Sequence, residues 1–302
     1  MRGPELADPS HKQVDAASYN LAAVEFDGLT ERFSGPLAMR MLEVAQLQAK
    51  DHVLDVGTGT GLVALRAGSL ARNGRVIGID HSSGMLEQAS AKAQRSRLDD
   101  VVTFQQMDAE QLEFPDQCFD AVLSLYALFH FPEPLVAIRE MHRVLRTGGK
   151  VVIGVGSGPS LCSWSGAVES VTVASQFVAA ARGRLLTAPH FLLRLMSEHG
   201  MSPDEKHEPK APRTRISQML QQVGFKRVHE RWQGYREVLD PEDFWVIQVT
   251  YTSQARIRLQ RAAHHEVAAL KDDFLERCRV VQANRGKLIY PHAAMFYAAT
   301  RA

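Results

Sequence analysis

A short run of residues, VLDVGTGTG at positions 53–61, combines groups that could hold a nucleoside-bearing cofactor. Four residues typical of a buried strand lead into three glycines, Gly57, Gly59 and Gly61. Glycine lets the backbone take a positive φ angle and approach a ligand closely. The helix expected after the loop offers free N–H groups and the positive end of its dipole. The run therefore predicts a cofactor-binding loop.

Two aspartates at the ends of later apolar runs could recognise the rest of a nucleoside. Asp80 closes RVIGID, and a carboxylate there can accept two hydrogen bonds from a ribose diol. Asp108 closes VVTFQQMD, where its carboxylate and the N–H of Ala109 could meet the edge of an adenine ring. Either aspartate could instead cap a following helix, because acidic residues favour helix N-termini.

The glycine loop alone does not select the cofactor. A dinucleotide fingerprint has the form G-x-G-x-x-G, and its third glycine packs a helix against a strand. Gly57 and Gly59 match that form, but Leu62 occupies the third glycine position and Gly61 comes one residue early. At this level the loop is compatible with a dinucleotide and with other adenosine-containing cofactors.

One histidine is a candidate general base. His130 lies in YALFHFPEP, just after the fourth expected strand and at the same edge of the sheet as the glycine loop. An imidazole titrates near neutral pH and can therefore accept a proton from an acidic hydroxyl. A histidine that only packs the loop would give the same pattern, so both interpretations stay open.

The elements that must position these residues alternate between short strands and helices. After a polar start and a helical stretch over 16–47, the expected strands are 52–57, 75–80, 101–108, 118–128 and 150–156, with helices at 62–74, 82–96 and 133–149. Two further strands are expected within 213–232 and 288–302. This alternation predicts an α/β fold with a doubly wound, seven-stranded, mostly parallel sheet. Ligands of such sheets bind outside the carboxyl ends of the strands.

Composition excludes several classes of function. The 302 residues carry 35 Lys+Arg against 34 Asp+Glu, a balance without the basic excess typical of nucleic-acid or anionic-lipid binding. No run approaches the 18 apolar residues of a membrane span, and the first residues lack the apolar core of a secretory signal. Cys118, Cys162 and Cys278 are widely spaced, which predicts free thiols and no metal site. We expect a cytoplasmic protein.

Several motifs together resemble one enzyme family. In order, they are VLDVGTGTG, VIGIDHSSGML, MDAEQLEFPDQCFD, RVLRTGGKVVI and MLQQVGF. Their order and spacing resemble the class I S-adenosylmethionine-dependent methyltransferases, in particular the branch of ubiquinone, menaquinone and natural-product small-molecule methyltransferases. The resemblance is strong over residues 50–156 and partial over 213–232 and 288–302. It implies a Rossmann-like fold with helical cap insertions.

The resemblance also implies a role for each matching position. It assigns Gly57, Thr58 and Gly59 to the methionine part and ribose of the cofactor, Asp55 to orienting that loop, and Asp80 to the ribose hydroxyls. It places the adenine between His81 and Met85, with its edge against Asp108 and Ala109, and it brings Ser124 and Leu125 near the sulfonium. Family members often close an N-terminal helix over the cofactor, so Tyr19 and Phe33 become further candidates.

The expected organisation follows from the break in the strand–helix alternation after residue 156, together with the resemblance. It consists of an N-terminal helical segment that closes over the cofactor (1–48), an S-adenosylmethionine-binding core (49–156), a helical cap insertion (157–212), a core helix and strand (213–234), a second helical insertion (235–287) and a terminal core strand (288–302). Its two long insertions either cap the site, or extend the core or form an oligomer interface.

The resemblance implies methyl transfer to an oxygen or carbon of a small, fairly apolar metabolite, with S-adenosyl-L-methionine as cofactor. The fourth strand continues as SLYALFHF, without the Asn-Pro-Pro-Tyr type of motif of amino-methylating enzymes, so we expect no nucleic-acid substrate. Two alternatives stay open: an NAD(P)-dependent oxidoreductase and a methyltransferase-like binding protein without activity. The sequence does not decide the oligomeric state, and a homodimer is one of the options.

Overall fold

The structure is a computed structural model, and it describes residues 9–156, 179–180, 182–187, 190–201 and 215–302. The expectations for Cys162 and for most of the segment 157–212 lie outside these residues. Among the described residues, none of the helices has the length and apolar character needed to cross a lipid bilayer.

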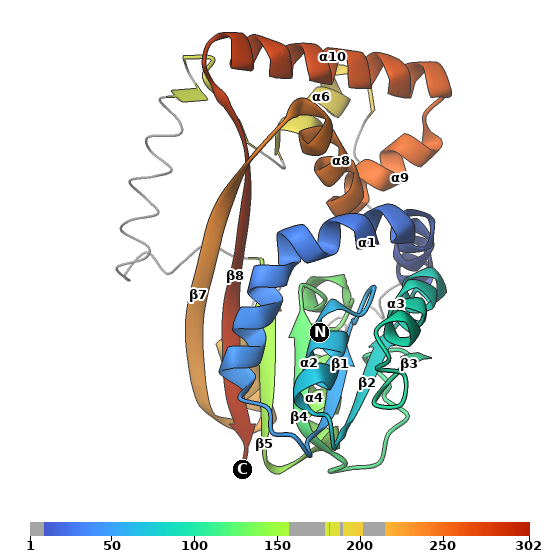
Figure 1. The fold of residues 1–302 in the computed structure, drawn as a ribbon, viewed down its shortest axis with the longest axis vertical. Helices are drawn as coiled ribbons and strands as arrows, with labels where there is room; N and C mark the ends of the chain where they lie inside the picture. Colours follow the sequence, from blue (N-terminus) through green and yellow to red (C-terminus); the bar gives the residue numbers. More distant parts are fainter. Residues whose placement is uncertain (1–8, 157–178, 181, 188–189, 202–214) are drawn as a thin grey trace, which may run out of the picture. The chain divides into compact units, whose positions relative to one another are not determined.

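The central element is a mixed β-sheet (Figure 1). Its parallel part contains β1 (His52–Val56), β2 (Arg75–Asp80), β3 (Val102–Gln106), β4 (Phe119–Leu125) and β5 (Leu145–Val155). The strand order is β3-β2-β1-β4-β5-β8-β6, where β8 (Lys287–Arg301) runs antiparallel to β5 and β6 (Leu185–Thr187) runs parallel to β8. A long strand, β7 (Phe225–Leu239), also pairs with β8.

This topology confirms the predicted doubly wound, mostly parallel α/β fold. Seven of the strands, β1–β5, β7 and β8, correspond to the seven that the sequence predicts. The three-residue β6 is an addition, so the described part of the chain forms an eight-stranded sheet.

Helices cover both faces of the parallel strands. On one face, α4 (Pro134–Val144) and α7 (Ile216–Val223) join Leu54 and Val56 of β1 in a single apolar cluster. Because side chains alternate along a strand, Asp55 points to the other face. That face carries α2 (Leu62–Leu70), α3 (Ser83–Arg95) and the long α1 (Pro9–Ala45), which packs on both.

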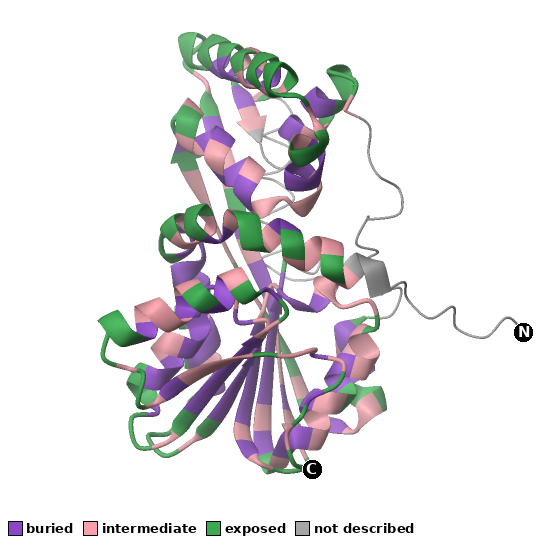
Figure 2. Cartoon of the chain, turned by 90° about the vertical axis from the view of Figure 1, so that its right-hand side faces the viewer, coloured by how far each residue is buried: buried purple, intermediate pink, exposed green. Residues whose placement is uncertain are grey.

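The inner strands are buried along most of their length (Figure 2). In β1 every residue after His52 is buried, as is expected for a parallel sheet covered on both faces. Only the strand ends emerge at the carboxyl edge, so the polar residues placed there are held by a rigid framework.

The chain divides into two compact units. The first contains Met1–Ser157, Pro209–Gln233 and Ala294–Ala302, and the second contains Gly158–Glu208 and Gly234–Ala293. Described helices of the second unit are α6 (His190–Glu198), α8 (Pro241–Tyr251), α9 (Ser253–Arg261) and α10 (His264–Ala283). Their aromatic core brings the rings of Phe191, Phe244 and Phe274 within 5.0–6.3 Å of one another, centroid to centroid.

The first helix begins earlier than the sequence predicted. It includes Pro9, whereas the apolar pattern suggested a start near Ala16. Proline fits the first turn of a helix because the missing N–H would have no partner there. The polar residues from Lys12 to Asp15 therefore lie on a helix, which fixes the direction of their side chains.

Other boundaries also differ from prediction. The helix expected over 62–74 ends at Leu70. The helix expected over 133–149 ends at Val144, because Leu145 is extended and pairs with Phe119. The following Arg-Thr-Gly-Gly forms an irregularity in β5, where the register shifts and Gly148 has φ +80°. Strand β7 continues to Leu239, so the helical part expected from residue 235 begins at Pro241.

Candidate functional site

The glycine loop after β1 lies at the carboxyl edge of the sheet. Gly57, Gly59 and Gly61 have φ angles of +71°, +54° and +82°. The backbone N–H groups of Gly57 and Thr58 both donate to the carbonyl of Ile79, at 2.9 and 2.8 Å. The loop is therefore folded over the end of β2, the neighbouring strand, and its backbone conformation favours glycine.

Asp55 holds the glycine loop in place through hydrogen bonds. Its buried carboxylate accepts a hydrogen bond from the Thr58 hydroxyl at 2.7 Å and from the Ala64 N–H of α2 at 3.1 Å. Burial raises the pKa of Asp55 to about 7, although both donors favour the ionised form. Asp55 therefore orients the loop relative to the start of α2.

Asp80, at the end of β2, also binds the glycine loop. Its Oδ2 accepts the Gly59 N–H at 2.8 Å, and its Oδ1 accepts the Ser82 N–H at 2.9 Å. Burial raises the pKa of Asp80, and these hydrogen bonds partly oppose that shift. The N-cap of α3 is Ser82, whose Oγ accepts the Met85 N–H at 3.2 Å. Asp80 therefore does not cap that helix, and it keeps lone pairs for a ligand diol.

Asp108 follows β3 and is shared with α1. Lys12 Nζ lies 2.6 Å from Asp108 Oδ2 and 2.6 Å from Glu110 Oε2. The N–H of Glu110 donates to Asp108 Oδ1 at 2.9 Å. Burial alone would raise the pKa of Asp108, but the hydrogen bonds from Lys12 and Glu110 outweigh it and lower the pKa. Ala109, next to Asp108, is buried.

The end of β4 lies beside the glycine loop. The register pairs Asp55 with Leu123, so Ser124 and Leu125 are level with Val56 and Gly57. Ser124 is fully buried, and its Oγ has no hydrogen-bond partner within the described part of the chain. Buried hydroxyl groups normally have a hydrogen-bond partner, so the Ser124 hydroxyl could bind a ligand at this edge of the sheet.

His130 is held by two side chains of α1. It ends a short 3-10 helix, Leu128–His130, that follows β4. Its Nδ1 lies 2.9 Å from Asp15 Oδ2, and its Nε2 lies 3.4 Å from the Tyr19 hydroxyl. Because a carboxylate can only accept, the contact with Asp15 places a ring proton on Nδ1. In the neutral ring, Nε2 then carries the lone pair of a general base.

Two of the remaining predicted residues join these contacts through their backbones: the His81 N–H donates to the Asp80 carboxylate, and the Met85 N–H donates to Ser82 Oγ. His81 is exposed, and its carbonyl accepts a hydrogen bond from Gln106 Nε2 at 2.9 Å. Met85 is buried in the first turn of α3. Phe33 is fully buried on α1, 14 residues after Tyr19.

Four residues that contribute to this edge were not predicted from the sequence: Lys12, Asp15, Asn20 and Glu110. Asn20 Oδ1 accepts the Ser82 hydroxyl at 2.7 Å and the Gly84 N–H at 2.9 Å, which fixes α1 to the start of α3. The helical spacing of Lys12, Asp15 and Tyr19 could have revealed a common face once Pro9 is taken as a helix start.

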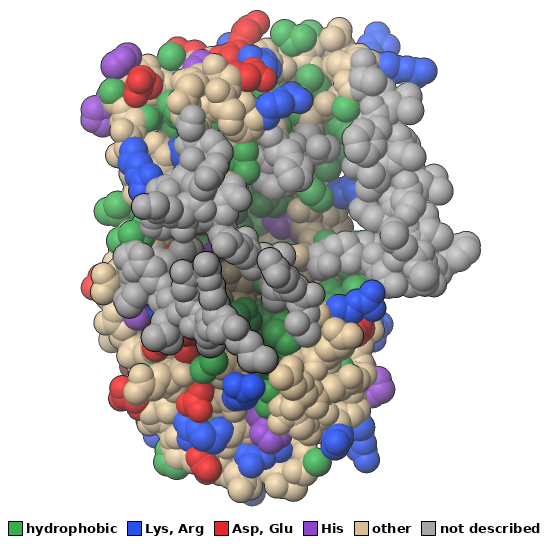
Figure 3. All heavy atoms as spheres, turned by 180° about the vertical axis from the view of Figure 1, so that it is seen from behind, with side chains coloured by type: hydrophobic (Ala, Val, Ile, Leu, Met, Phe, Trp, Pro, Cys, Tyr) green, Lys and Arg blue, Asp and Glu red, His purple; other side chains and the backbone are tan. Residues whose placement is uncertain are grey.

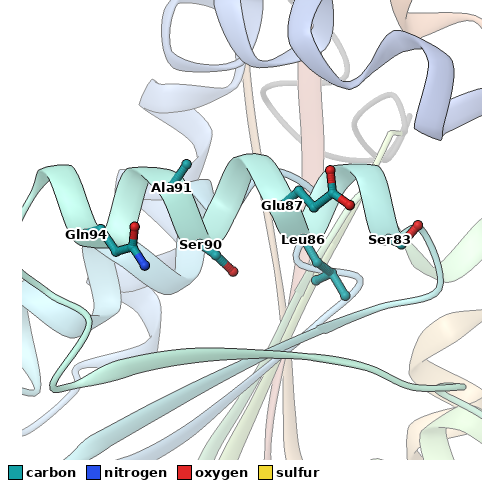
Figure 4. Close-up of a pocket in the computed structure, with 6 residues that line it drawn as sticks. All are labelled: Ser83, Leu86, Glu87, Ser90, Ala91 and Gln94. Atoms are coloured by element: carbon teal, nitrogen blue, oxygen red, sulfur yellow. The ribbon is translucent and has the colours of Figure 1, made fainter.

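Surface cavities that are lined by described residues lie elsewhere. One, of about 400 Å³, is lined only by residues of α3, shown in Figure 4: Ser83, Leu86, Glu87, Ser90, Ala91 and Gln94. Another, of about 720 Å³, is lined mainly by residues in and just after α2 and α3. Neither contains a predicted site residue.

Charge and possible metal ligands add no competing site in the part of the chain that the structure describes. Acidic and basic side chains are interspersed on the face drawn in Figure 3, in line with the net charge of +1. The described residues contain no cluster of three or more His, Cys, Asp or Glu side chains that could hold a metal ion.

Comparisons with known proteins agree with this geometry. Residues 54–153 match the family model of a methyltransferase domain. The chain is 38% identical over 126 residues to 27-O-demethylrifamycin SV methyltransferase of Amycolatopsis mediterranei, covering 42% of this chain and 43% of that protein. It is 34% identical over 158 residues to demethylmenaquinone methyltransferase of Symbiobacterium thermophilum, covering 51% and 59%.

The chain thus spans about half the length of these curated relatives. Among solved structures, the YcgJ protein of Bacillus subtilis has the same fold, with a TM-score of 0.55, 22% identity, and coverage of 88% of this chain and 98% of that one. The family match identifies residues 54–153 as a methyltransferase domain, in agreement with the ordered motifs and with the resemblance found in the sequence.

Proposed function

We propose that this protein is an S-adenosylmethionine-dependent methyltransferase that methylates an oxygen or carbon of a small, fairly apolar metabolite. The observation that carries the proposal is the contact between the glycine loop and Asp80, with Asp108 at the end of the next strand. The glycine loop, a hydrogen-bond acceptor for a ribose diol (Asp80) and one for an adenine amine (Asp108) therefore lie along one edge of the sheet.

The described residues fit the cofactor. Gly59 and Thr58 would face its methionine part, Asp80 would accept the ribose hydroxyls, and Asp108 with Ala109 would bind the adenine edge. The buried Ser124 hydroxyl and Leu125 would lie near the sulfonium, since β4 is level with the glycine loop. When bound, S-adenosylmethionine supplies a methyl group that is already activated for displacement.

The chain's own contribution is positioning and proton handling. A hydroxyl or enol acceptor reacts best after losing its proton, and His130 Nε2 is the base we propose for that step. Asp15 keeps the Nδ1 proton in place, and it stabilises the imidazolium that forms. Tyr19, on the same face of α1, closes over the ring edge, with the two rings 5.5 Å apart and 80° inclined.

The class of acceptor rests on the relatives. One is named for an O-demethylated rifamycin and the other for demethylmenaquinone, and both acceptors are small molecules. These names support a small-molecule acceptor for this chain without selecting oxygen or carbon. The homodimer considered from the sequence stays a prediction.

Of the two alternatives, the dinucleotide enzyme is disfavoured. Its third glycine would stand at Leu62, the first residue of α2, and residues 54–153 match a methyltransferase model instead. A binding protein without activity would keep the same cofactor contacts, so only an activity measurement separates it from an enzyme.

Calorimetric titration with S-adenosylmethionine and with NADH tests the cofactor. We expect binding of the first and none of the second; the reverse result would overturn the proposal. Transfer of a labelled methyl group to a panel of phenols, hydroquinones and enols, followed by mass spectrometry, then tests the acceptor class. Cofactor binding without transfer to any of them would favour the inactive binding protein.

A further inference from the structure

The N-terminal half of α1 faces the site with polar side chains. Lys12, Asp15, Tyr19 and Asn20 all make polar contacts with residues at the carboxyl edge of the sheet. A helix on a protein surface usually turns an apolar face inward. The position of α1 on this edge must therefore depend on individual pairs of polar side chains. Among these pairs, the contacts of Lys12 with two carboxylates carry the most charge.

Lys12 is a bridge between two carboxylates. Its single ammonium lies 2.6 Å from both Asp108 Oδ2 and Glu110 Oε2, so these two oxygens are at most about 5 Å apart. Without a cation between them, two carboxylates at this separation repel each other, and one must move or take up a proton. The three side chains are 23%, 35% and 14% exposed, so solvent screens the pair only in part.

Glu110 is the more buried of the two acids. Its other oxygen, Oε1, accepts the Glu133 N–H at 2.7 Å. Asp108 is held by the Glu110 N–H on Oδ1 and by Lys12 on Oδ2. Because Asp108 is the more exposed acid, it has more room to move than Glu110 when Lys12 is removed.

Lys12 leaves room for a ligand. A carboxylate has about four acceptor positions, and Asp108 uses two of them. An exocyclic amine can thus bind Asp108 while Lys12 stays in place. The lysine and the ligand need not compete.

We propose that Lys12 is a positioning residue for the cofactor: it holds Asp108 where that carboxylate accepts the adenine amine, and so ties the docking of α1 to recognition of the base. This inference rests on the proposed function, because it concerns the same cofactor. It adds a base-selecting role for a side chain that lies outside the matched methyltransferase domain.

The role has a specific chemical signature. Adenine presents an amine to Asp108, whereas hypoxanthine presents a carbonyl oxygen, which a carboxylate repels. A well-placed Asp108 therefore discriminates between the two bases, because a polar group left without a partner weakens binding strongly. A displaced Asp108 loses this discrimination even if the rest of the site is intact.

The test uses the intact chain and two probes, S-adenosylhomocysteine and S-inosylhomocysteine, titrated by calorimetry. We expect wild type to prefer the adenosine compound, and Lys12→Met to weaken its binding about tenfold or more while changing the inosine compound little. Lys12→Arg should restore most of the preference. In Lys12→Met, adding Glu110→Gln should restore part of it, because that change removes the repelling charge but keeps an acceptor for Glu133.

Lys50→Met is the matched control, since Lys50 is an exposed lysine between α1 and β1. An unchanged preference in Lys12→Met, or an equal loss with Lys50→Met, would overturn the inference. If wild type binds neither compound, the proposed cofactor itself is wrong, and the two failures are thus distinguishable. Should Lys12→Met fail to fold, Lys12→Arg and Glu110→Gln alone still test the contact between Lys12 and Asp108. Both variants should keep the preference for the adenosine compound, and loss of that preference in either would contradict the inference.

Discussion

Gly57 and Ala127 meet where the loops after β1 and β4 come together: a Cβ built on Gly57 would lie 2.2 Å from the Ala127 Cβ. Gly57 also has φ +71°, a conformation that other residues adopt with difficulty. Two independent constraints, backbone conformation and close approach, therefore require glycine at this position. The same contact sets the spacing between the glycine loop and the segment that carries His130.

The first prediction concerns this contact. Gly57→Ala should destabilise the protein by about 2 kcal/mol or more, because the methyl group must displace Ala127 and occupy an unfavourable φ. It should also abolish binding of S-adenosylmethionine. Urea unfolding and calorimetry measure the two effects. Gly28→Ala is the control, since nothing lies within 4 Å of its Cβ; equal behaviour of the two variants would contradict the argument.

The second prediction follows from the raised pKa of Asp55, which is about 7 in the folded chain against an ordinary value of 3.8. The folded state then binds more protons than the unfolded state between these values. The stability that Asp55 contributes is full below about pH 4 and is lost as pH rises toward 7. The loss is at most about 4 kcal/mol at 1.4 kcal/mol per pKa unit.

Asp55→Asn removes this titration but keeps an oxygen that can accept from Thr58 and Ala64. Without cofactor, urea midpoints measured between pH 5 and 8 should fall more steeply with pH for wild type than for the variant. Parallel profiles would show that Asp55 has an ordinary pKa. Other titrating groups cancel in the difference, which is why the variant is essential.

The third prediction tests His130 as the base. For a hydroxyl acceptor, His130→Gln should lower kcat by roughly 100-fold or more, the usual contribution of a general base. Asp15→Asn should lower kcat less, because it alters the orientation of the ring and leaves the base in place.

Binding of S-adenosylhomocysteine serves as the check on both variants. It should change little, since the hydrogen bonds of His130 are with Asp15 and Tyr19 of α1. A loss of binding equal to the loss of kcat would assign His130 to α1 docking alone.

The fourth prediction concerns Asp80. Asp80→Asn offers one acceptor oxygen in place of two, so it cannot serve Gly59, Ser82 and a ribose diol together. Affinity for S-adenosylmethionine should fall about 100-fold, because charge-assisted hydrogen bonds are about twice as strong as neutral ones. Asp100→Asn, an exposed substitution at the turn before β3, should leave affinity unchanged. Calorimetry with both variants decides the point.

The parts of the site that depend on local pattern were predictable from the sequence. Gly57, Asp80 and Asp108 each close an apolar strand, and parallel strands bring their carboxyl ends to one edge. The family resemblance then assigned roles to them. The fold class followed from the same alternation of strands and helices.

The parts that depend on long-range contacts were not predictable. Lys12 pairs with residues 96 and 98 positions away, and no periodicity in its own segment announces these partners. Similarly, Arg-Thr-Gly-Gly after Val144 continued a helical pattern, but pairing of Leu145 with Phe119 overrode that local preference. In both cases a tertiary partner decides, and a single sequence does not show it.

The long α1 is held in two different ways, and its dynamics should differ accordingly. Beyond Pro36, the buried Leu37, Met41 and Leu42 anchor it among apolar side chains, whereas the segment from Lys12 to Asn20 is anchored by charges and polar groups. Release of that first segment from the sheet would expose charged side chains to water but little apolar surface. One continuous helix would then consist of two cooperative units, with amides of the first exchanging their hydrogens far faster than those of the second, and with salt, rather than denaturant, as the agent that opens the first.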